Sequence, residues 1–252
     1  MSLELLKLIA RDQQIFSIDD LSKKTQIKKD ILKVILSRLV DRGFIETIEK
    51  GKYLIIPLGS EKGKYTLHEF VIGSYLVEPA AISYWSALNY FGLSEQIPNT
   101  VFIQTTSRKK KTFINVFGVD YQMVRIKPEK FFGFKKEWFE ETPVTITDKE
   151  KTIIDCLDQP QYSGGVIEVV KAMSNKSLKF VTLNQYAIKF DNSNLIRRLG
   201  FLFDLLDFPH TLPLPKSNKY IPLDPTMPVI GNKIPKWRLV NNLGDSIKGD
   251  LE

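Results

Sequence analysis

Residues 17–57 constrain the fold most, because they combine two helix patterns with a hairpin pattern. Ser17 precedes Asp20 by three positions, a spacing at which side-chain oxygens satisfy the free amide groups of a first helical turn. This helix is predicted to end near Thr25. A short turn then leads to a second helix, so the stretch predicts a helix-turn-helix.

The second helix is predicted at about residues 28–42. Its apolar residues recur at helical spacing and define the predicted buried side: Ile31, Leu32, Ile35, Leu36 and Leu39. The opposite side carries Lys29, Lys33 and Ser37. Gly43 is predicted to end the helix, because glycine adopts the left-handed conformation at little cost.

Residues 44–48 and 52–56 are predicted strands around the turn Glu49-Lys50-Gly51. Helix, turn, helix and hairpin is the order of a winged helix-turn-helix, predicted here at residues 1–60. In that architecture the second helix enters the major groove of DNA and the hairpin flanks it. An amphipathic helix is predicted before it, at residues 2–11.

DNA binding requires cations near phosphates and side chains that reach base edges. The stretch supplies candidates for both: Lys28, Lys29, Lys33, Ser37, Lys50 and Lys52. Two other interpretations stay open. The basic face can be an ordinary solvated one, and winged helices also serve as protein-binding modules.

Composition limits the class of protein. The chain has 252 residues, a net charge of +7 and a pI near 9.2, which suits an acidic partner such as nucleic acid. One cysteine excludes a disulfide framework within the chain, and two distant histidines lack metal-ligand spacing. No signal peptide and no apolar run of membrane-spanning length is found, so a cytoplasmic protein is predicted.

The rest of the sequence predicts a polar linker at residues 58–64 and then an α+β domain at residues 65–252. Two helices are expected first, the second at residues 80–91. Strands are expected within about 99–147, helices within 148–207 and an extended tail at 209–252. A basic hairpin tip is predicted between strands 101–106 and 112–117, and its cations are Arg108, Lys109, Lys110 and Lys111. This tip fits a solvated turn, a second phosphate contact or a contact to an acidic partner.

Carboxylates are the strongest candidates for catalysis: Asp148, Glu150, Asp155, Asp158 and Glu168. Paired carboxylates near a lysine can hold a divalent cation in a nuclease. Asp148 and Glu150 are also ordinary first-turn residues of a helix. Gly164-Gly165 precedes a helix, as phosphate-binding loops do, but lacks their full pattern. We therefore predict a binding protein with no catalytic residue, metal or cofactor.

Four sequence segments together resemble the AbiEi family of antitoxins. They are GKYLIIP, YLVEPAAISYWSALNYFGLSEQIPNTVFIQTTSRKK, KFFGF and VTITDKEKTIIDCLDQPQYSGGVIEV. The resemblance covers about residues 17–206. AbiEi proteins are the transcriptional-regulator half of type IV toxin-antitoxin systems linked to phage defence.

The resemblance implies a winged helix that binds inverted repeats in the operon's own promoter. By position in that module it implies DNA contacts at Lys28, Lys29, Lys33, Arg38, Lys50 and Lys52. It also implies a larger antitoxin domain that counters a nucleotidyltransferase-like toxin, without requiring a stable complex. The alternative function is a metal-dependent nuclease or nucleotide-processing enzyme that a winged helix targets.

Overall fold

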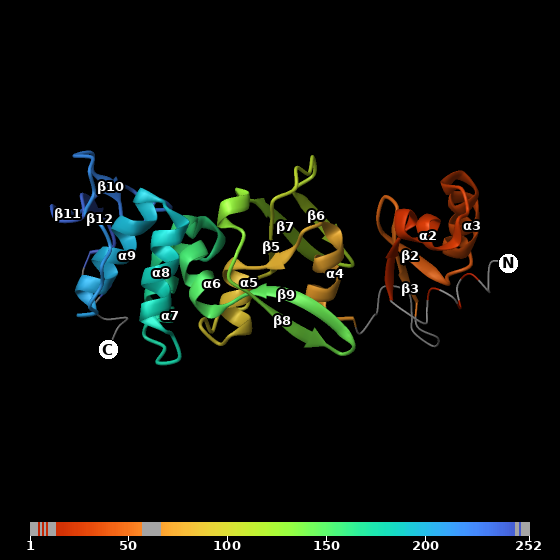
Figure 1. Cartoon of the computed structure of the whole chain (residues 1–252), viewed down its shortest axis with the longest axis horizontal. Coiled ribbons are helices and arrows are strands. Elements are labelled where there is room, and N and C mark those ends of the chain that lie inside the picture. Colours follow the sequence, from red (N-terminus) through yellow and green to blue (C-terminus); the bar gives the residue numbers. More distant parts are fainter. Residues whose placement is uncertain are drawn as a thin grey trace.

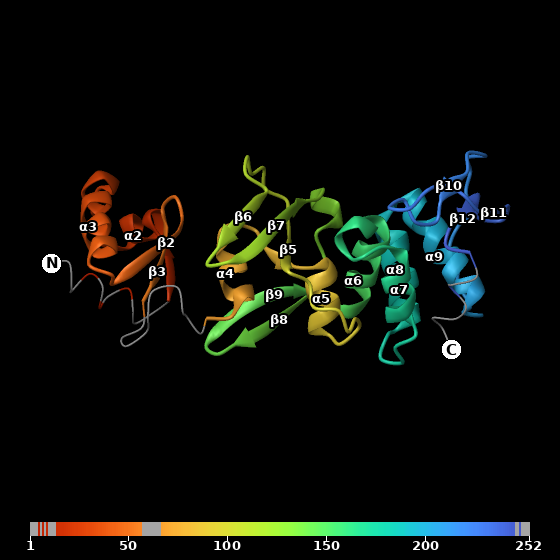
Figure 2. The same cartoon turned by 180° about the vertical axis from the view of Figure 1, so that it is seen from behind.

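The computed structural model describes residues 14–56 and 67–244, together with Leu5, Lys7, Ile9 and Ile247. Most of the predicted first helix, the linker at 58–64 and the last two residues lie outside the described residues. The described chain is a mixed α+β protein, as predicted. Three parts follow one another along its length: an N-terminal module, a central sheet, and a helical part with a small C-terminal sheet (Figures 1 and 2).

Over residues 14–56, the N-terminal module contains two helices and a three-stranded sheet. Its elements are β1 (Ile15–Ser17), α2 (Ile18–Thr25), α3 (Lys29–Asp41), β2 (Ile45–Glu49) and β3 (Lys52–Ile55). β3 pairs antiparallel with both β1 and β2. β1 has no counterpart among the predicted elements, because three residues before a helix cap are too few to show an alternating pattern.

The apolar side of α3 fills the core of this module. Leu32, Leu36 and Leu39 are almost fully buried there. Ile31 was predicted on the buried side, and that prediction is wrong, because its side chain is 51% exposed. At 3.6 residues per turn, Ile31 projects from the edge of the buried stripe into solvent. Gly43 follows the helix with φ +71, as predicted.

The central part is a six-stranded mixed sheet of strand order β6-β7-β5-β4-β9-β8. Its elements are α4 (Glu69–Leu76), β4 (Ala81–Ile82), α5 (Tyr84–Tyr90), β5 (Thr100–Thr105), β6 (Phe113–Val116), β7 (Val119–Arg125), β8 (Phe134–Phe139) and β9 (Thr142–Thr147). α4 packs closely on this sheet, because a Cβ added at Gly73 would lie 3.2 Å from Ile103 Cδ1 and 3.3 Å from Tyr121 Cε1.

One prediction about this part is wrong and another is wrong in part. The helix predicted at residues 80–91 is present as α5, but its predicted start is wrong, because Ile82 of β4 pairs with Ile103 of β5 and Ile146 of β9. Residues 107–111 do not close a hairpin, since β7 lies between β5 and β6, parallel to β5 and antiparallel to β6. Strand order depends on which apolar surfaces pack together, and neighbouring strand patterns in a sequence do not record it.

Helices form the third part, as predicted, and the tail packs on them. The elements are α6 (Lys149–Asp158), α7 (Val166–Met173), α8 (Phe180–Phe190), α9 (Ser193–Leu205), β10 (Ile221–Pro222), β11 (Asn232–Ile234) and β12 (Leu239–Asn241), with 3-10 turns at Pro128–Lys130 and Pro160–Tyr162. The tail is not simply extended, because its three strands form a sheet of order β10-β12-β11. Trp237 is fully buried against Gly200 of α9, where a Cβ would lie 2.2 Å from the indole ring.

An apolar contact joins the N-terminal module to the central part. Ile15, Ile48 and Leu54 of the module belong to one buried cluster with Phe70 and Leu76 of α4. Packing at this junction was not expected, because the polar linker suggested two parts that share little surface. The module residues that make this contact are single positions in short strands, and the α4 surface that they pack on follows the linker in the sequence. Local sequence patterns therefore do not reveal the contact.

Candidate nucleic-acid interface

Local hydrogen bonds fix the angle between α2 and α3. Ser17 Oγ accepts from the Asp20 N–H at 3.0 Å, as its predicted capping role requires. Gln26 ends α2 in the left-handed region at φ 59, and its N–H donates to the Ser22 carbonyl at 2.9 Å. Ser22 Oγ in turn donates to the Ile27 carbonyl at 2.8 Å. These hydrogen bonds connect the end of α2 to the turn that leads into α3.

α3 lies at the side of the module that faces away from the central sheet (Figures 1 and 2). Its predicted contact residues are all exposed: Lys28, Lys29, Lys33, Ser37 and Arg38. Lys50, at the turn between β2 and β3, is exposed as well. Six of the seven predicted DNA-contacting residues thus remain accessible to a partner.

Two of these lysines form ion pairs on the surface. Lys29 Nζ lies 2.6 Å from Asp19 Oδ1, and Lys33 Nζ lies 2.9 Å from Asp30 Oδ1. The hydrogen bond and positive charge of Lys29 lower the pKa of Asp19, and Lys33 lowers that of Asp30 in the same way. Such exposed pairs contribute little to stability, so a phosphate can replace either aspartate.

Lys52, the seventh residue, points into the junction. Its Nζ donates to the Leu76 carbonyl at 2.7 Å and lies 3.6 Å from Glu49 Oε2. Lys109 reaches the same site, with its Nζ 2.8 Å from Glu49 Oε2. Burial, and then the charge of Lys109, lower the pKa of Lys52. Lys109 was expected at an exposed tip; that expectation is wrong, and only Arg108, Lys110 and Lys111 of that segment are exposed.

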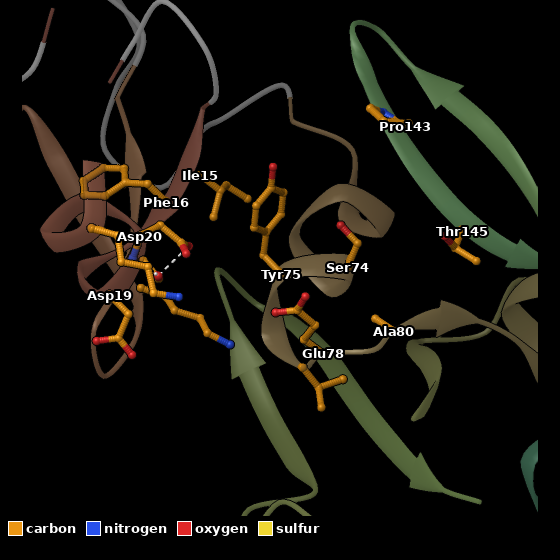
Figure 3. Close-up of a pocket in the computed structure, with 14 residues that line it drawn as sticks. Ile15, Phe16, Asp19, Asp20, Ser74, Tyr75, Glu78, Ala80, Pro143 and Thr145 are labelled. Carbon is orange, nitrogen blue, oxygen red and sulfur yellow. Dashed lines mark hydrogen bonds between the residues drawn. The ribbon is translucent and has the colours of Figure 1, made fainter. Parts of the chain in front are cut away.

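A groove of about 620 Å³ runs along the junction. β1 and α2 line one wall, and α4 and β9 line the other (Figure 3). Asp19, Asp20 and Glu78 make it acidic, whereas Lys23 and Lys52 balance part of that charge. A mixed lining of this kind does not match a polyanion, so the groove is not part of the candidate interface.

The carboxylates considered for catalysis hold local structure. Their contacts are as follows: Asp148 accepts from the Lys151 N–H (2.7 Å), Glu150 from the Lys179 N–H (2.8 Å), Asp158 from Lys130 Nζ (3.2 Å) and Glu168 from Ser94 Oγ (3.0 Å). Among the residues that the structure describes, no three His, Cys, Asp or Glu side chains are grouped to hold a metal ion. These hydrogen bonds give each of the four carboxylates a structural role.

Asp155 forms a fully buried ion pair with Lys151, four residues earlier on α6. The rings of Phe132 and Phe190 lie 5.1 and 5.2 Å from the Lys151 ammonium. Burial raises the pKa of Asp155 to about 6, and the Lys151 charge opposes that rise. This pair lies within the core and is not open to a substrate.

The N-terminus of α7 is also occupied. Gly164 and Gly165 have φ +76 and +93, and they open the helix as predicted. Asp224 of the tail places Oδ2 2.7 Å from the Val166 N–H, and a Cβ at Gly165 would lie 2.7 Å from the same oxygen. A carboxylate of the chain itself thus fills the position that a phosphate would take.

Two side chains of the candidate interface were missed. Ile31 and Val34 lie on the outer surface of α3, although a helical apolar pattern assigns Ile31 to the core and gives Val34 no role. Their distance from the centre of the buried stripe was the available signal. α3 therefore presents an apolar pair beside its cations.

Comparison with known proteins provides a fold but no function. No family model matches the chain, and no curated protein matches it. Among solved structures, the crystal structure of the RV2827C protein from Mycobacterium tuberculosis is similar, with a TM-score of 0.61. The match has 15% sequence identity and covers 96% of this chain and 91% of that one. At this identity the similarity establishes a shared fold over nearly the full length and nothing about activity.

A helix needs about 20 mostly apolar residues to cross a bilayer. Within the described ranges, no helix is both long and apolar enough to do so.

Proposed function

We propose that the N-terminal module is a winged helix-turn-helix that binds double-stranded DNA, with α3 in the major groove and the β2–β3 hairpin as the wing. One observation carries this proposal: α3 lies at the side of the module remote from the central sheet (Figure 1), and its polar and basic residues are exposed. The exposed cations Lys28, Lys29, Lys33 and Arg38 suit phosphates on both sides of a groove.

The DNA is proposed to be an operator with inverted repeats in the protein's own promoter, so that binding represses the operon. The larger part, residues 65–252, is proposed to be the antitoxin domain that counters a nucleotidyltransferase-like toxin without a stable complex. The sequence segments that resemble AbiEi antitoxins support this function. A cytoplasmic location follows from it, since both operator and toxin act there.

We propose a non-enzymatic role. The carboxylates of α6 and α7 are held by contacts to neighbouring backbone and side-chain donors. A nuclease would need carboxylates directed at a shared cation. No specific observation favours the enzymatic alternative.

Salt dependence of binding tests the DNA proposal. A labelled duplex from the region upstream of the gene is titrated with full-length protein at several salt concentrations. Removing one cation that neutralises a phosphate should reduce the slope of log K against log salt by about 1. Lys28→Ala and Arg38→Ala should each flatten the slope, whereas Lys216→Ala, an exposed tail lysine, should not. Absence of salt-dependent binding to any duplex would overturn the proposal.

A further inference from the structure

The outer face of α3 carries two large aliphatic side chains that the fold does not use. Ile31 is 51% exposed and Val34 is 53% exposed, whereas the remaining leucine and isoleucine residues of the helix are buried. β-branched residues are weaker helix formers than leucine or lysine and lose side-chain freedom on a helix. Neither helix formation nor core packing therefore explains the pair.

Their position along α3 is informative. They lie three residues apart, in the first two turns, and Arg38 continues the same row four residues after Val34. Lys29 and Lys33 form a second row on the other flank. In a helix docked in a major groove, the N-terminal turns approach the base edges, and flanking cations meet the phosphates.

We propose that Ile31 and Val34 contact the C5-methyl groups of thymines in the bound operator. This inference rests on the proposed function and adds what the helix reads. Thymine alone among the four bases presents a methyl group in the major groove, and apolar side chains recognise it. Aliphatic side chains make no hydrogen bonds, so the methyl is the only base feature that favours them.

A second copy of this chain is the competing occupant of the face. Two-fold pairing through Ile31 and Val34 would bring the Arg38 side chains of both copies together, and these like charges repel, whereas Lys29 and Lys33 are already paired with Asp19 and Asp30. Two aliphatic side chains also fall far short of the roughly 800 Å² that each partner buries in a standard interface. Cations beside the apolar pair instead complement the phosphates of DNA.

The test removes methyl groups from the DNA. Full-length protein selects duplexes from a random library, and each thymine of a selected duplex is replaced in turn by deoxyuridine, which lacks only the methyl. For wild type, affinity should fall about three- to five-fold at each contacted thymine. Ile31→Ala with Val34→Ala should bind the selected duplex more weakly and lose its sensitivity to deoxyuridine at those positions. Val181→Ala on α8, 73% exposed, is the matched control and should behave as wild type.

The outcomes separate the inference from the proposed function. A wild-type protein that selects a sequence but tolerates deoxyuridine everywhere overturns thymine reading and leaves DNA binding intact. A protein that selects no duplex and binds none in a salt-dependent manner overturns both. If wild type sediments as a dimer and the double variant sediments as a monomer, Ile31 and Val34 form a protein interface and thymine reading is overturned. Circular dichroism of each variant confirms that the α3 substitutions leave the fold unchanged.

Discussion

Lysine and aspartate pair on α3 and on α6 at similar spacing, but in opposite environments. On α3, Lys33 pairs with Asp30, and the side chains are 65% and 91% exposed. On α6, Lys151 pairs with Asp155, and the side chains are 0% and 1% exposed. Water and salt screen the first pair, so its lysine can exchange aspartate for phosphate. The second pair does not exchange partners, because separating Lys151 from Asp155 would leave an unpaired charge in a medium of low dielectric.

This contrast separates the proposed binding surface on α3 from a structural site on α6 within one chain. Glu49 and Lys109 at the junction form an intermediate case, with side chains 22% and 18% exposed. The two pairs within helices look equivalent in the sequence, whereas Glu49 and Lys109 are 60 residues apart and the sequence does not show that they pair. Burial decides which of these pairs can take part in binding. The more deeply a pair is buried, the larger the loss of stability we expect when it is broken.

The largest effect is expected from Asp155→Asn, which leaves the Lys151 ammonium buried without its partner charge. We expect a loss of about 3–5 kcal/mol in the free energy of unfolding, measured with urea. Asp30→Asn, the surface counterpart, should leave the melting temperature unchanged. Replacing both charges, by Lys151→Met with Asp155→Leu, should recover most of the loss. A double variant as unstable as the single one would contradict this account of the buried pair.

The same pair should also carry no catalysis. Incubation of wild type with magnesium or manganese and either DNA or RNA should give no cleavage. Cleavage that Asp155→Asn abolishes in a folded protein would restore the enzymatic alternative.

On the surface of α3, substitutions should change binding and leave stability alone. Lys29→Ala with Lys33→Ala should weaken operator binding in a mobility-shift assay and reduce the slope of log K against log salt by about 2, because each lysine is proposed to neutralise one phosphate. Repression should be abolished. Under the proposed function, growth rescue against a nucleotidyltransferase-like toxin expressed from a foreign promoter should persist. Loss of rescue by a folded variant would show that the proposed antitoxin activity itself depends on α3.

The junction should give the smallest effect. Lys109→Met keeps the aliphatic stem but removes the cation beside Glu49, and Lys52 remains 3.6 Å from that carboxylate. We expect a loss of about 1 kcal/mol in unfolding free energy, since the pair is only partly buried. Lys110→Met, on the exposed part of the same segment, is the control and should have no effect. Equal unfolding free energies for the two variants would show that Lys109 does not stabilise the junction.

Much of the N-terminal module could be predicted from local patterns. Ser17 caps α2, Gly43 takes a positive φ after α3, and Leu32, Leu36 and Leu39 fill the core. Each of these features depends on interactions within a few residues, so its signal is complete in a short window of sequence. Most of the candidate contacts on α3 follow from the same helical period.

The rest required contacts between distant segments. The sequence by itself determined the helix order, the caps, the apolar stripe of α3 and the excess of basic residues. Only the tertiary structure decided that β4 is a central strand, that Lys52 and Lys109 point inward to Glu49, and that Ile31 faces solvent. Orientation and burial depend on surfaces far apart in the chain, and the free energy that selects them arises only when those surfaces meet.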